Sequence, residues 1–151
     1  FLCSKRVLTQ PLLYLSAYFE RDRESYYDQL LRVTETGDWI PWLNYFLIGV
    51  AEQAHDALLR TRRVRALHEE MRDVLQVNRA SGNALRLLDE LFERPFMTAP
   101  RAAQLLEITT SGARGILDRL DDLGIVELLP NRWPRLYVAR ELLDVIEQPV
   151  G

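Results

Sequence analysis

The sequence predicts a mostly α-helical fold: the end of an all-α domain, a long connecting helix, and a winged helix-turn-helix with a two-stranded wing. Nine of the fourteen aromatic residues fall between Tyr14 and Phe46, which concentrates core-forming side chains in one stretch. From Trp39 to Leu75 apolar residues recur at helical spacing, and after Gly82 three helical patterns precede two strand-like segments. These observations divide the chain into residues 1–80, the helical part, and residues 81–151, the winged helix-turn-helix.

Local signals set the ends of the helices in the aromatic run. A helix over Asp22–Thr36 carries a tyrosine pair on its apolar face, and Gly37 stops it. Asp38 is a suitable N-cap for the next helix, and Pro41 lies in its first turn, where a missing N–H costs little. We expect the following aromatic side chains to form core: Tyr26, Tyr27, Trp39, Trp42 and Phe46.

The helix that starts at Trp39 is predicted to run for about 38 residues, or roughly 55–60 Å. No Pro or Gly interrupts its pattern after Gly49, and a linker over Asn78 to Gly82 follows it. Its second half is highly charged and favours a solvated strut with one packed face. Pairing across a dimer is the alternative. The narrow apolar stripe of this half contains Val64, Leu67, Met71 and Leu75.

Residues 81–151 follow the element order of a winged helix-turn-helix. Thr98 is expected to cap the second of three helices, and the third ends at Gly124. A last short helix begins near Arg140. Two strands, Ile125–Leu129 and Leu136–Val138, flank a loop that contains two prolines and form the predicted wing.

In a DNA-reading winged helix the third helix enters the major groove. Here the exposed positions of the third helix carry two arginines, whose charge is offset by Asp118 and Asp122. Residues 81–151 as a whole contain 8 basic and 11 acidic side chains, for a net charge of −3. A phosphate-tracking surface normally shows a basic excess, so domain packing or self-association is one interpretation of this domain. The other is DNA contact through Ser111, Arg114, Arg119 and Arg132.

The sequence lacks the residues that several kinds of catalysis require. The segment from His68 to Arg72 departs from the zinc motif H-E-x-x-H because arginine replaces the second histidine, so His68 is read as an ordinary helix-surface residue. The seven glycines stand singly, so no phosphate-binding loop exists, and Cys3 has no C-x-x-C partner. We therefore expect no catalytic residue, no metal site and no cofactor in this chain itself.

The bulk composition bounds the class of protein. With 48% hydrophobic and 27% charged residues the chain is typical of a soluble globular protein, and no apolar run is long enough for a membrane span. It starts at Phe1 without an initiator Met or a signal peptide, which suggests a fragment of a longer protein. The single cysteine and the missing signal peptide favour the cytoplasm.

The segments PLLYLSAYF, YYDQLL and GDWIPWLNYFLIGV occur in this order, and with them the sequence resembles the Fic family of nucleotidyl transferases. In that family the segment follows the catalytic loop, and many bacterial members continue into a C-terminal winged helix. The resemblance implies that the parent protein transfers AMP, or a similar group, from ATP with Mg²⁺ to a Ser, Thr or Tyr hydroxyl of a target protein. The signature H-P-F-x-[DE]-G-N-G-R is absent here, so no catalytic residue is carried over.

The resemblance leaves a supporting role for this chain. It implies that the helices pack behind a catalytic half supplied from outside the chain, and that Tyr14 or Tyr18 lines the pocket for the nucleotide base; simple packing is the alternative for both tyrosines. The winged helix would then serve docking, self-association or target choice. A different hypothesis is a DNA-binding regulatory module whose helical half is a dimerisation arm.

Overall fold

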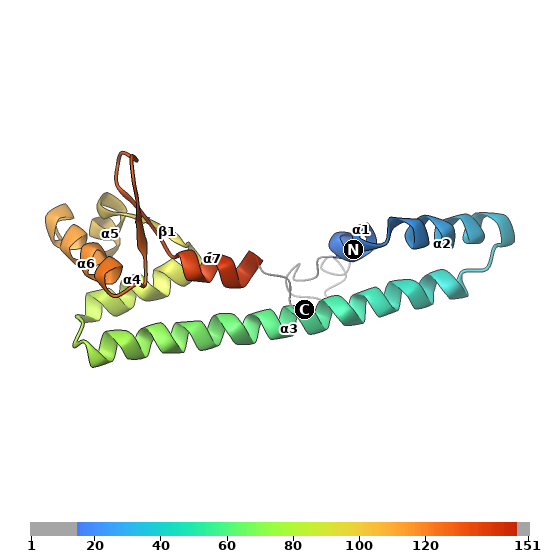
Figure 1. Cartoon of the computed structure of the whole chain (residues 1–151), viewed down its shortest axis with the longest axis horizontal. Coiled ribbons are helices and arrows are strands. Elements are labelled where there is room, and N and C mark those ends of the chain that lie inside the picture. Colours follow the sequence, from blue (N-terminus) through green and yellow to red (C-terminus); the bar gives the residue numbers. More distant parts are fainter. Residues whose placement is uncertain (1–14, 148–151) are drawn as a thin grey trace. The chain divides into compact units, whose positions relative to one another are not determined.

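The computed structural model describes residues 15–147 (Figure 1). This range is mostly helical and contains one small antiparallel sheet, as predicted. Its elements are α1 (Leu15–Arg21), α2 (Arg23–Thr36), α3 (Ile40–Val77), α4 (Gly82–Glu93), β1 (Phe96–Thr98), α5 (Ala99–Leu106), α6 (Thr110–Asp122), β2 (Glu127–Leu129), β3 (Leu136–Val138) and α7 (Arg140–Glu147).

The chain forms two compact units, here called unit 1 and unit 2, which divide between Thr61 and Arg62. The described part of unit 1 is residues 15–61, and that of unit 2 is residues 62–147. This division lies inside α3, earlier than the predicted boundary at 80/81. The reason is that the C-terminal half of α3 contributes its apolar stripe to the core of unit 2: Val64, Leu67, Met71 and Leu75.

The C-terminal end of α2 and the start of α3 follow the predicted signals, whereas the cap at the start of α2 was not predicted. The Ser25 N–H donates to Asp22 Oδ1 at 3.0 Å and caps α2. Gly37 ends this helix in the left-handed region at φ 68°, and its N–H donates to the Val33 carbonyl. The Ile40 N–H then donates to Asp38 Oδ1 at 3.1 Å, so the aspartate caps α3 from just outside it.

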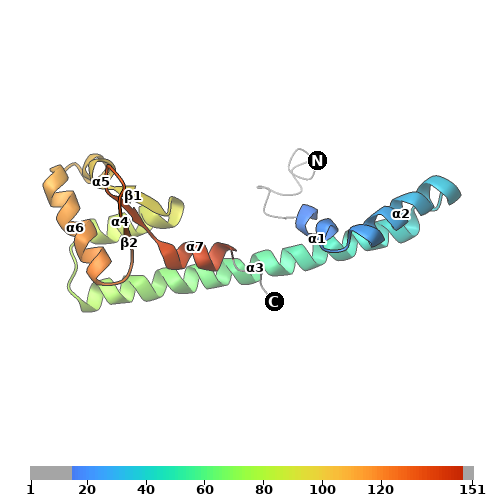
Figure 2. The same ribbon diagram turned by 45° about the horizontal axis from the view of Figure 1, so that its top comes forward.

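Unit 1 consists of α1 and α2 against the first half of α3. Figures 1 and 2 both show α2 running back beside that half. The ring of Tyr18 lies directly on Gly49, where a Cβ would come within 2.5 Å of the ring, and its centroid is 5.4 Å from that of Tyr45. Arg21 pairs with Glu52 at 2.7 Å and adds a polar tie between α1 and α3.

The expected aromatic core of unit 1 is only partly realised. Among its described hydrophobic side chains, Tyr18 alone is buried, and α2 has no buried residue. Tyr26, Trp42 and Phe46 are half-buried, whereas Tyr27 and Trp39 are 59% and 57% exposed. The prediction that all five form core is therefore wrong for Tyr27 and Trp39, because the helices of unit 1 cover one another on one side only.

The long helix has the predicted extent. It spans 38 residues, which corresponds to about 57 Å. Its charged second half is a strut with one packed face, since the apolar stripe is buried within unit 2 and not left for another chain. After a short turn, Ser81 caps α4 by accepting the Ala84 N–H at 3.3 Å.

Unit 2 encloses a continuous apolar core between α4, α5, α6, the sheet and the end of α3. The strand order is β1-β3-β2, with antiparallel pairing throughout. The hairpin of β2 and β3 was predicted, with β2 shorter than expected, whereas β1 was not. Thr98 occupies the N-cap position of α5 without a side-chain hydrogen bond, so its predicted capping role is not realised.

Candidate functional site

The exposed face of α6 is the first candidate site. Thr109 caps this helix by accepting the Gly112 N–H at 3.1 Å, and Ala113, Leu117 and Leu120 bury the opposite face. Ser111, Arg114 and Arg119 are exposed, as predicted, and helical spacing places them on one side. Arg132 is exposed in the β2–β3 loop.

The aspartates of α6 do not all belong to this exposed face. Asp118 is half-buried, contrary to the expectation that it is exposed, and accepts a hydrogen bond of 2.5 Å from the Tyr137 hydroxyl. Asp121 accepts the Leu128 N–H at 3.1 Å. These carboxylates hold α6 to β3 and β2 and keep their negative charge. Asp122 is exposed, as predicted.

Tyr137 makes the hydrogen bond that connects β3 to α6. Its side chain is fully buried in unit 2. Burial raises the pKa of the Tyr137 phenol above its ordinary value, and the Asp118 carboxylate raises that pKa further. The phenol therefore stays protonated and continues to donate to Asp118 well into the alkaline range.

The arginines of the candidate site have no acidic partner. Among the ion pairs between described residues, none includes Arg114, Arg119 or Arg132. Next to Arg132, Trp133 is 88% exposed, a position that the sequence interpretation did not single out. The available signal was a tryptophan beside a proline in a polar loop. An exposed aromatic side chain beside a cation is the combination used by proteins that stack nucleic-acid bases.

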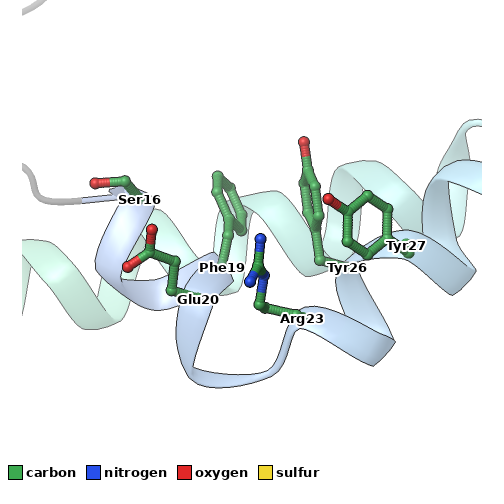
Figure 3. A pocket seen from close by; sticks show the side chains of 6 residues that line it. All are labelled: Ser16, Phe19, Glu20, Arg23, Tyr26 and Tyr27. Atoms are coloured by element: carbon green, nitrogen blue, oxygen red, sulfur yellow. The ribbon is translucent and has the colours of Figure 1, made fainter.

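A pocket of about 200 Å³ on the α1–α2 side of unit 1 is the second candidate site. Figure 3 shows its aromatic rings beside Glu20 and Arg23, neither of which has an ion-pair partner among the described residues. The Phe19 and Tyr26 ring centroids lie 4.9 Å apart. Ligand pockets usually measure ~300–1,000 Å³, so this one is too small to enclose a nucleotide. It is lined by Ser16, Phe19, Glu20, Arg23, Tyr26 and Tyr27.

Tyr18, one of the two tyrosines expected to line a nucleotide pocket, does not line this pocket. Tyr18 is only 8% exposed and packs on Gly49, and the Arg21 guanidinium lies 5.0 Å from the centroid of its ring. Within unit 1 its ring is thus used for packing, the alternative weighed above. Tyr14 lies outside the described residues.

His68 is more than an ordinary helix-surface residue, because it contacts two side chains of α4. Its Nε2 lies 2.8 Å from Asp89 Oδ1, and its ring meets Phe92 edge-on at a centroid distance of 4.7 Å. It thereby joins α3 to α4 within unit 2. In residues 15–147, no group of three or more His, Cys, Asp or Glu side chains is arranged to hold a metal ion.

The two candidate sites are the exposed arginines of α6 and of the β2–β3 loop in unit 2, with Trp133 in that loop, and a small aromatic pocket on unit 1. Across the described range, no helix has the length and apolar character needed to cross a membrane. No protein-family model matches the chain.

Proposed function

We propose that this chain is a non-catalytic part of a Fic-type nucleotidyl transferase. In this proposal unit 1 packs against the catalytic part of the protein, and unit 2 is a winged helix that docks a partner. The order of the segments PLLYLSAYF, YYDQLL and GDWIPWLNYFLIGV supports the family. The observation that carries the supporting role is the open aromatic layer of unit 1, in which α2 buries no residue.

The outer side of α2 has the chemistry of a surface that another polypeptide covers. Tyr27 and Leu31 are 59% and 54% exposed on it, beside the small pocket. Monomeric proteins rarely leave such contiguous apolar surface open. In addition, Gln29 Oε1 on α2 and Trp42 Nε1 on α3 are shielded from solvent without a hydrogen-bond partner. An unsatisfied buried polar atom costs about 1–3 kcal/mol, so these two atoms lower the stability of unit 1 by itself.

The activity belongs to the longer protein in this proposal. The resemblance assigns it AMP transfer from ATP with Mg²⁺ to a protein hydroxyl, and this chain contains no part of the motif that performs the chemistry. The 151-residue chain alone is thus expected to be inactive.

An AMP-transfer assay tests this division of labour. A labelled ATP analogue is incubated with a cell extract and either the 151-residue chain or a version extended upstream of Phe1. The proposal predicts labelled protein with the extended version only. An extended version that labels no protein at any Mg²⁺ concentration, while binding no nucleotide, would contradict it.

A second candidate function is nucleic-acid binding by unit 2. The specific observation in its favour is the set of three exposed arginines without ion pairs, together with the exposed Trp133, while Asp118 and Asp121 are engaged inward. A winged helix places its third helix in the major groove, which here is α6. The net charge of −3 on residues 81–151 opposes this function and predicts weak affinity.

Salt dependence is the appropriate test of this candidate. If the three arginines contact phosphates, the association constant for random duplex DNA should fall as the salt concentration rises. A plot of the logarithm of this constant against the logarithm of the salt concentration should have a slope of about −2.7. Arg114→Ala should make this slope shallower by about 0.9, which is the contribution of one phosphate contact. Arg72→Ala, on an exposed arginine of α3, is the matched control and should change nothing. Undetectable binding at low salt would rule this function out.

A further inference from the structure

The first third of α3 carries no charge. From Trp39 to Ala51 the sequence contains no Asp, Glu, Lys or Arg. A helix that is apolar all round is normally buried on all sides. Among residues 15–61 of unit 1, other elements cover only one side of this segment, the side on which Tyr45, Phe46 and Gly49 meet α1. The opposite side needs another partner.

That opposite side is a continuous apolar band, which we call the α3 stripe. Its members follow one another at intervals of three or four residues, the spacing that keeps them on one helix face. The band covers eighteen intervals, or about 27 Å. Ile40, Leu43, Leu47 and Leu58 in it are 68%, 46%, 60% and 49% exposed. The α3 stripe consists of Ile40, Leu43, Leu47, Ala51, Ala54 and Leu58.

We infer that the α3 stripe is the interface with a second copy of this chain, paired antiparallel about a two-fold axis that lies level with Gly49 along the helix, on the side of α3 opposite to this glycine. The distribution of side-chain sizes supports this occupant. In that register Leu47 of each chain faces Ala51 of the other, and the Leu43 end of the stripe faces Ala54. In the middle of the interface large residues thus meet small ones, which lets the two helices approach closely there, while Ile40 of one chain meets Leu58 of the other at each end.

The charges at the two ends of the stripe agree with the same arrangement. Asp38 lies just before the N-terminal end of α3, and Arg62 is exposed just past the C-terminal end of the stripe. Neither takes part in an ion pair among the described residues. Antiparallel pairing brings Asp38 of each chain to within about one helical turn of Arg62 of the other, whereas parallel pairing would set like charges side by side.

This interface differs from the dimer considered for the second half of α3, because that half buries its stripe in unit 2. A single helix pair is smaller than a standard interface of about 800 Å² per partner. The resulting dimer should therefore be reversible, with a dissociation constant on the order of micromolar or weaker. The inference does not depend on the family or on the function proposed above.

Sedimentation equilibrium of the full chain at low and high micromolar concentration tests the interface. Leu47→Glu should weaken dimerisation by roughly a hundredfold or more, because each chain would bury an unpaired carboxylate. The matched control is Val77→Glu, which places the same charge on an 83% exposed apolar position of the same helix outside the stripe. Circular dichroism should show unchanged helicity in both variants, since both positions are exposed.

Charge removal and cross-linking test the direction of pairing. Asp38→Ser, which keeps a capping side chain at the start of α3, or Arg62→Ser should weaken the dimer, and the double variant should be no weaker than either single variant, because both changes remove the same charge pair. For cross-linking, Cys3 is first replaced by serine, so that the introduced cysteine is the only one. A mixture of Ile40→Cys and Leu58→Cys chains should then cross-link with a short bismaleimide, whereas Ile40→Cys alone should not.

Three outcomes would overturn the inference. A chain that stays monomeric at high micromolar concentration would show that a different protein, or another part of a longer one, covers the stripe. A dimer that Leu47→Glu leaves intact would place the interface elsewhere. Efficient cross-linking of Ile40→Cys alone would replace the antiparallel arrangement by a parallel one.

Discussion

Replacing Tyr137 by phenylalanine removes one hydroxyl group from the connection between α6 and β3. The side chain is fully buried, and the hydroxyl donates to Asp118 Oδ1 at 2.5 Å. Phenylalanine keeps the ring, so the substitution opens no cavity of consequence. A hydrogen bond to a charged group contributes about 1.5–3 kcal/mol. Because Asp118 is only half-buried, water reaches its carboxylate after the change, so we expect a loss of about 1.5–2 kcal/mol.

Thermal unfolding followed by circular dichroism measures this loss. For a domain of the size of unit 2 about 4–8 °C corresponds to 1 kcal/mol, so the midpoint of unit 2 should fall by about 6–16 °C. Hydrogen exchange of the α6 amides should show the destabilisation in unit 2 and leave α1 and α2 unchanged. Tyr27→Phe is the matched control, because this tyrosine is 59% exposed and should change stability by less than about 0.5 kcal/mol. A Tyr137→Phe midpoint within error of the control would refute the reasoning that this bond holds α6 to the sheet.

Three further predictions concern single positions. Gly49→Ala should destabilise unit 1 by about 1–3 kcal/mol in the same assay, because the new Cβ would lie 2.5 Å from the Tyr18 ring; Gly115→Ala, with open space around it, should instead stabilise α6 by up to about 1 kcal/mol. Thr109→Ala removes the cap of α6 and should cost about 1 kcal/mol, seen as faster hydrogen exchange in its first turn, while an unchanged exchange rate would contradict the capping role. The pKa of Tyr137 is raised in the folded chain, so its contribution to stability is present below the ordinary tyrosine pKa and is lost as pH rises toward the raised value. The stability difference between wild type and Tyr137→Phe should accordingly shrink in alkaline solution, and a difference that grows there would contradict the sign of the shift.

The parts of the fold that depend on neighbouring residues could be predicted from sequence. Gly37 ends α2 and Asp38 starts α3 through hydrogen bonds that span only a few residues. The extent of α3 follows equally from uninterrupted local periodicity. Ser111, Arg114 and Arg119 are exposed on α6 because helical phase alone determines which face the buried Ala113 and Leu117 leave open.

The parts that could not be predicted depend on distant partners. The strand β1 is three residues long and exists because β3, some forty residues later, pairs with it. Asp118 has the pattern of an exposed charge until Tyr137 is folded against it. In unit 1 the aromatic composition indicates burial, but burial of Tyr27 and Trp39 requires a further layer of polypeptide. The composition of a segment indicates how much apolar area it can bury, but it does not indicate which other segment covers that area.

We have proposed that this chain works beside a Fic-type catalytic part. The decisive measurement for this proposal is the reading frame immediately upstream of the codon for Phe1. We predict that its translation contains the motif H-P-F-x-[DE]-G-N-G-R shortly before Phe1, in the same frame. An upstream frame without a histidine-containing motif of this form would contradict the account and leave the arginine surface of unit 2 as the basis for function.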